Sequence, residues 1–207
     1  MIQDNDILKY AAPLIIFILG IFFAPYIESR KEKSKAKRIY NALIVEIEDE
    51  LKELPLKLQK IAMALEGANN FKNHQPEIGD IVKYVPRDIF LYFTKQTMDS
   101  SFKLLNKDQR NAMKSLIVLI EAINKYSNDI KDCQVTDARI GEIINNYKRY
   151  LYTGPCIINT MRIVLNKTKV VSGKSDNDII KEVLSEFEIN ISIDELRIKR
   201  TVTLDSA

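Results

Sequence analysis

The sequence predicts an all-α protein, with one N-terminal transmembrane helix followed by a cytoplasmic helical bundle of about five helices. Three observations predict this fold class. Residues 10–27 contain no charged side chain. Glycine and proline occur only six times each in 207 residues, which favours long helices with few tight turns. In the rest of the chain, apolar residues recur three and four positions apart, the spacing of one helix face.

The uncharged stretch from Tyr10 to Ile27 is long enough to cross a bilayer as a helix. Its eighteen residues span about 27 Å, close to the thickness of the hydrocarbon core. A cleaved signal peptide is not favoured, because the preceding residues are acidic and the apolar run is too long. We expect Pro25 to kink the helix. Gly20 and Ala24 share one face and predict close packing of two spans, with simple lipid exposure as the alternative.

The segment that follows, residues 28–38, holds six basic and two acidic side chains, whereas residues 39–207 are neutral overall. The positive-inside rule therefore predicts a cytoplasmic body and an external N-terminus. The basic residues are also predicted to contact anionic lipid headgroups, and the alternative is that they only set the topology. Because the body has no basic surplus, nucleic-acid binding is not favoured. The six residues are Arg30, Lys31, Lys33, Lys35, Lys37 and Arg38.

Beyond the membrane, apolar residues form a heptad seam over residues 40–65, spaced alternately four and three positions apart. Other apolar residues lie outside the seam, so the apolar face is wider than a two-stranded coiled coil needs and a bundle helix is favoured. We expect this helix to end near Gly67 and to be kinked or divided at Pro55. The seam consists of Tyr40, Ile44, Ile47, Leu51, Leu54, Leu58, Ile61 and Leu65.

Further helices are expected after a connection over residues 68–87. The second helix should run from residue 88 to about residue 105. Asn106 and Gln109 then form a capping-box pattern that predicts a third helix, ending near Asp132.

The remaining helices are predicted by similar signals. Thr136 is expected to cap a helix that ends at Gly154, and Pro155 is expected to begin another. Ser175 and Asp178 form a second capping-box pattern, which opens the last helix.

These elements divide the chain into four parts. Residues 1–27 form the N-terminal tail and transmembrane helix, and residues 28–38 form the basic juxtamembrane segment. Residues 39–187 form the helical bundle, and residues 188–207 are expected to be a loosely ordered tail.

The chain offers few groups for catalysis or metal binding. Its one histidine, His74, lies in a polar connection, and Cys133 and Cys156 are too far apart in sequence to form a metal-ligand pair. Residues 171–175 end like a phosphate-binding loop, but Thr168 stands where that pattern needs glycine. The sequence therefore predicts no enzyme activity, no cofactor and no metal site.

A dense group of carboxylates on the seam helix has a simple explanation. Glu46, Glu50 and Glu53 share one face, and Lys57 and Lys60 continue near it. This pattern predicts an exposed, salt-bridged surface rather than a metal site or an acid–base pair.

One aromatic–basic cluster is a candidate ligand site. Its tyrosines could stack on a base, and its cations could hold a phosphate-bearing ligand. The alternative is that the tyrosines are half-buried at the bundle surface with solvated hydroxyls. The cluster consists of Tyr147, Lys148, Arg149, Tyr150 and Tyr152.

Two functions are compatible with these features. The first is a membrane-anchored scaffold or signal-sensing module that acts by self-association or by binding a protein partner. The second is a membrane effector, such as a toxin or defence protein, whose body senses a signal through residues 147–152 and whose spans assemble to perturb the membrane. Both functions imply a bilayer with anionic headgroups and a homo-oligomer or protein partner.

Overall fold

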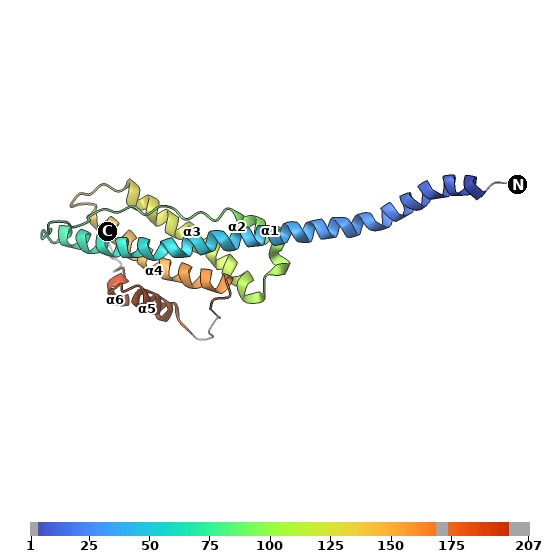
Figure 1. Cartoon of the computed structure of the whole chain (residues 1–207). Helices are drawn as coiled ribbons and strands as arrows, with labels where there is room; N and C mark the ends of the chain where they lie inside the picture. Colours follow the sequence, from blue (N-terminus) through green and yellow to red (C-terminus); the bar gives the residue numbers. More distant parts are fainter. Residues whose placement is uncertain (1–3, 169–173, 199–207) are drawn as a thin grey trace, which may run out of the picture.

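The computed structural model describes residues 4–168 and 174–198, and within them all regular secondary structure is helical, which confirms the predicted fold class. In these two ranges, six α-helices are joined by a π-helical turn, a 3₁₀ turn and irregular connections. Figure 1 shows an elongated helical body from which the N-terminal part of one long helix projects alone.

The long helix α1 runs from Asp4 to Lys72 without interruption, a length of 69 residues. It extends beyond the expected end at Gly67 and is not divided at Pro55, so the predicted division is wrong. Packing against the body explains this, since tertiary contacts routinely outweigh the loss of one helical hydrogen bond. Figure 1 shows a bend in the N-terminal part of α1, the part that contains Pro13 and Pro25. The candidate membrane segment and the central helix of the body are thus one continuous element.

The heptad seam of α1 is covered by the chain's own helices. Ile47, Leu54, Leu58 and Ile61 are fully buried in the single core, where α1 packs mainly against α4. The seam therefore acts as the apolar face of a bundle helix, as predicted.

After α1 the chain turns and runs back beside this helix in an extended conformation (Figure 1). The expected second helix begins five residues late and is irregular: α2 spans Phe93–Gln96, the π-helical turn η1 spans Thr97–Ser101, and the 3₁₀ turn η2 spans Phe102–Leu104. The Glu46 carboxylate on α1 explains the late start, because it accepts hydrogen bonds from the N–H groups of Tyr92 (3.2 Å) and Phe93 (3.0 Å).

Helices α3 (Lys107–Asp132) and α4 (Ile140–Val164) form an antiparallel pair behind α1 (Figure 1). The capping box at the start of α3 is confirmed. Two predictions about α4 are wrong. A turn over residues 136–139 precedes the helix, so Thr136 is not its cap, and the helix continues through Pro155. Both Gly154 and Pro155 are buried, so core packing holds the helix together across the proline.

Helix α5 (Asp176–Glu186) packs on α4 and begins at the predicted capping box. The short helix α6 (Ile193–Leu196) follows, with Ser192 as its cap. Ile189 and Leu196 are buried in the core, so the described part of the C-terminal tail packs against the body.

Candidate functional site

The N-terminal part of α1 presents an apolar surface that the chain does not cover. Every residue from Pro13 to Ile27 is exposed, including eleven large hydrophobic side chains. In the described part of the chain, α1 is the one helix that is long and apolar enough to cross a membrane. A contiguous apolar surface of this size marks a site for contact with a membrane or another protein.

The basic juxtamembrane segment follows directly on the same helix. All six predicted lipid-contacting side chains are exposed, and within the described residues none of them forms an ion pair. Arg30 also lies over the ring of Tyr26, 5.1 Å from its centroid. At 100° per residue these side chains cover an arc of about 200° around the helix axis, so cations face outward over rather more than half of its circumference. The six are Arg30, Lys31, Lys33, Lys35, Lys37 and Arg38.

Hydrogen bonds join the body to α1 near the end of this segment and just beyond it. The Ser101 hydroxyl donates to the Ala36 carbonyl (2.7 Å). The buried amide of Gln109 donates to the Tyr40 hydroxyl (3.1 Å) and to the Val164 carbonyl (2.7 Å). These bonds join η1, α3 and α4 to α1, so the direction in which α1 leaves the body is fixed.

The structure divides the predicted aromatic–basic cluster between the core and the surface. Tyr147 and Tyr150 are fully buried, so they are unavailable for stacking on a ligand. Burial raises the pKa of Tyr147 to about 12, and it also raises the pKa of Tyr150. Lys148, Arg149 and Tyr152 instead line a separate hollow of about 270 Å³ beside α6. The five residues therefore form no common surface, and only the last three remain a predicted ligand site.

The carboxylates of α1 are not all on an exposed surface. Glu50 and Lys57 form an ion pair of 2.5 Å, and their side chains are only 13% and 9% exposed. Burial raises the pKa of the Glu50 carboxyl, an effect that the hydrogen bond from Lys57 opposes. The prediction of an exposed salt-bridged face is therefore wrong for this pair, whereas Glu53 is exposed as expected. Within the described residues, no group of three metal-ligating side chains occurs.

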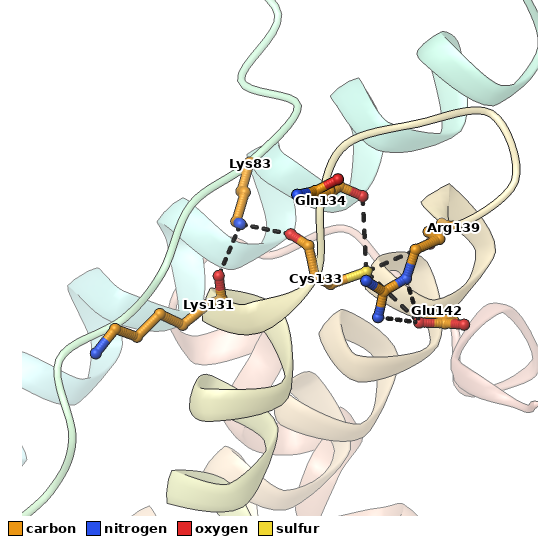
Figure 2. Close-up of polar contacts among 6 residues, drawn as sticks. All are labelled: Lys83, Lys131, Cys133, Gln134, Arg139 and Glu142. Atoms are coloured by element: carbon orange, nitrogen blue, oxygen red, sulfur yellow. Dashed lines mark hydrogen bonds and ion pairs between the residues drawn. The ribbon is translucent and has the colours of Figure 1, made fainter.

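The buried Cys133 belongs to a polar cluster at the C-terminal end of α3 (Figure 2). The Lys83 ammonium donates to the carbonyls of Lys131 (3.0 Å) and Cys133 (2.6 Å). The Cys133 sulfur lies 3.7 Å from the Arg139 carbonyl and 3.6 Å from a Glu142 carboxylate oxygen. Burial raises the pKa of the thiol, which keeps it protonated and able to donate. The cluster satisfies carbonyl groups at the C-terminal end of α3, so its role is structural.

A groove of about 710 Å³ lies between α3, α4 and α5. Its walls are partly apolar, and Arg162 at its rim is held by Glu186 through two hydrogen bonds (2.8 and 2.6 Å). Cys156 lines the groove, but burial raises its pKa to about 11, which disfavours the reactive thiolate.

The other residues considered for chemistry are isolated. His74 is exposed in the turn after α1, with a left-handed backbone conformation (φ 56°). Residues 171–173 of the sequence that resembles a phosphate loop lie outside the described residues, and Ser175 caps α5.

No protein-family model, curated protein or solved structure matches this chain. The main feature that the fold itself does not use is the apolar and basic N-terminal part of α1.

Proposed function

We propose that the protein is a single-pass membrane protein whose helical body lies in the cytoplasm and acts by self-association or by binding a protein partner. The observation that carries this proposal is the exposure of every residue from Pro13 to Ile27 on a helix of spanning length. Burying this surface in hydrocarbon removes a large apolar area from water, which is the main driving force for membrane insertion.

The orientation rests on the exposed basic segment. Six exposed cations follow the apolar stretch within eleven residues, whereas Lys9 alone precedes it. Labelling with a membrane-impermeant maleimide tests the orientation, in a background where Cys133 and Cys156 are serine. Gln3→Cys should be labelled in intact cells, and the exposed Ile78→Cys should be labelled only after permeabilisation. Labelling of Ile78→Cys in intact cells contradicts the proposed orientation.

Self-association is supported by an uncovered face along α1. A Cβ atom on Gly20 would have no neighbour within 4 Å. Val45, Leu56 and Met63 are also exposed. At 100° per residue they lie within about 20° of Gly20 around the helix axis. Because α1 is continuous, one partner helix could contact this face both in the membrane and beside the body.

Disulfide cross-linking in native membranes tests this face. Met63→Cys should give a covalent dimer in the same cysteine-free background, and Val118→Cys, an exposed position on α3, is the matched control. Monomer alone for Val45→Cys, Leu56→Cys and Met63→Cys contradicts self-association through α1.

A membrane effector is the second candidate, because α1 joins the candidate span and the core of the body without a break. A movement of the body would then be transmitted to the span. Expression in cells loaded with a membrane-potential dye distinguishes the two functions. Depolarisation supports an effector, and an unchanged potential under every inducing condition supports a scaffold.

A further inference from the structure

We propose that a groove at the membrane-proximal end of the body binds the phosphate headgroup of an anionic phospholipid. The groove lies between α1 and a tip formed by residues 97–104, which are η1 and η2. This inference rests on the proposed membrane anchoring of α1, and it adds a lipid-binding site to the body.

The end of the groove nearest the proposed span reaches the headgroup layer. The groove is lined by residues 29–37 of α1 and by residues 98–104 of the tip, and its volume is about 1070 Å³. Ser29 lies two positions beyond Ile27, or about 3 Å along the helix axis. The headgroup layer extends roughly 5–8 Å beyond the hydrocarbon on each side. The end of the groove at Ser29 therefore opens within the headgroup layer when residues 10–27 fill the hydrocarbon core, and the other end, at Lys37, lies about 15 Å beyond Ile27.

The charge of this end of the molecule suits an anionic lipid. Lys33, Lys37 and Lys103 line the groove, together with the carboxylates of Glu32 and Asp99. The excess of basic over acidic side chains is larger in the segments around the groove, because residues 28–41 and 93–110 together hold ten basic and four acidic side chains. The rest of the body carries a net charge of −2. The neutral body is thus polarised, with its basic end toward the proposed membrane.

The tip combines these cations with apolar side chains. Leu104 is 51% exposed beside Lys103. The Arg110 guanidinium lies over the half-buried ring of Phe102, with its Cζ atom 5.2 Å from the ring centroid. Apolar side chains interleaved with cations are typical of segments that lie in the bilayer interface. The hydrogen bond from Ser101 to the Ala36 carbonyl fixes the tip against α1. Leu104 would therefore meet the lipid at a defined depth.

Tryptophan fluorescence tests this contact, because the chain contains no tryptophan of its own. Three single substitutions are compared in the full chain, reconstituted into vesicles with lipids brominated near the headgroup end of their acyl chains. Phe22→Trp reports insertion of α1, Leu104→Trp reports the tip, and Ile78→Trp, an exposed position in the connection that follows the C-terminal end of α1 at Lys72, is the aqueous control. We expect quenching of Phe22→Trp and Leu104→Trp but not of Ile78→Trp.

The outcomes separate this inference from the proposed function. If Phe22→Trp is quenched and Leu104→Trp behaves like Ile78→Trp, the inference is overturned and the membrane anchor stands. If Phe22→Trp is not quenched either, the anchor and the inference fail together.

Lipid selectivity is measured with the same Leu104→Trp probe. Brominated phosphatidylglycerol should quench it more strongly than brominated phosphatidylcholine in mixed vesicles. Lys103→Gln should reduce this preference about fivefold, whereas Lys72→Gln, at the far end of α1, should leave it unchanged. Equal quenching by the two brominated lipids overturns the assignment to an anionic headgroup.

Discussion

The Tyr147 hydroxyl accepts a hydrogen bond from the backbone N–H of Tyr84 (2.7 Å) and donates one to the carbonyl of the same residue (3.1 Å). This pair of bonds ties the extended connection after α1 to helix α4. Tyr150, one turn later on α4, is equally buried, but its hydroxyl has no hydrogen-bond partner among the residues that the structure describes. The two tyrosines therefore offer a matched comparison between a satisfied and an unsatisfied buried hydroxyl.

Replacing Tyr147 by phenylalanine should lower the free energy of unfolding by about 1–3 kcal/mol, because both backbone groups of Tyr84 lose their partner. Tyr150→Phe should be neutral or slightly stabilising, since it removes a hydroxyl that makes no bond. Urea unfolding of the detergent-solubilised protein, followed by circular dichroism, measures both changes. Equal destabilisation by the two substitutions would show that the bonds to Tyr84 contribute nothing.

Close contact between α1 and α4 depends on Gly154. A Cβ atom at this position would lie 2.5 Å from Cδ2 of Leu58 on α1, so Gly154→Ala forces side chains in the core to move. We expect a loss of about 1–3 kcal/mol in the free energy of unfolding. Gly141→Ala, at a position on α4 where a Cβ would meet no atom within 4 Å, is the control and should not destabilise.

A double-mutant cycle identifies the contact responsible. Leu58→Ala alone should cost about 2–5 kcal/mol because it leaves a cavity. In the double variant, the alanine at position 154 fills part of that cavity, so the total loss should be smaller than the sum of the two single losses. Strict additivity would mean that Gly154 and Leu58 do not constrain each other.

The ion pair between Arg162 on α4 and Glu186 on α5 should make the free energy of unfolding depend on pH in the acidic range. The bonds from Arg162 hold the pKa of the Glu186 carboxyl below its ordinary value of 4.5. A depressed pKa in the folded state gives stability that is present above pH 4.5 and is lost as the pH falls through the folded-state value. Glu186→Gln should therefore destabilise by up to about 1 kcal/mol at neutral pH, given its partial exposure. It should have no effect below the folded-state pKa.

Urea unfolding at several pH values between neutrality and strong acid measures this difference. Glu121→Gln, an exposed position on α3 with no ion pair among the described residues, is the control and should change nothing at any pH. A cost for Glu186→Gln that persists in acid would show that its origin is not the ion pair.

Local signals in the sequence predicted the fold well where local chemistry decides the structure. The capping boxes at Asn106 and Ser175 were found where their side-chain spacing predicted them. The heptad seam likewise identified the face of α1 that the core buries. Both signals depend on residues within a few positions of each other, so they can be read without the rest of the structure.

Features that depend on distant parts of the chain were not predicted. Pro55 and Pro155 disfavour a helix locally and so predict that each helix ends there. Packing of α1 against α4 nevertheless keeps both helices continuous. The division of the tyrosine cluster follows from the same packing. Tyr147 lies three and four positions from the buried Ile143, Ile144 and Leu151, and this helical spacing indicates its burial. The tip at residues 97–104 was missed because no sequence pattern shows that it folds back against α1 beside Ser29.

The central claim is that the N-terminal part of α1 spans a bilayer, and alkaline carbonate extraction of membranes tests it most directly. The intact protein should remain in the membrane pellet, as should Ile18→Leu combined with Phe22→Leu. Ile18→Arg combined with Phe22→Arg places two charges near the centre of the span, at a cost of about 6 kcal/mol, and should move the protein into the soluble fraction. Unfolding of its body should be unchanged, because both positions lie outside the core. Extraction of the intact protein, or equal retention of the arginine variant, would contradict the account.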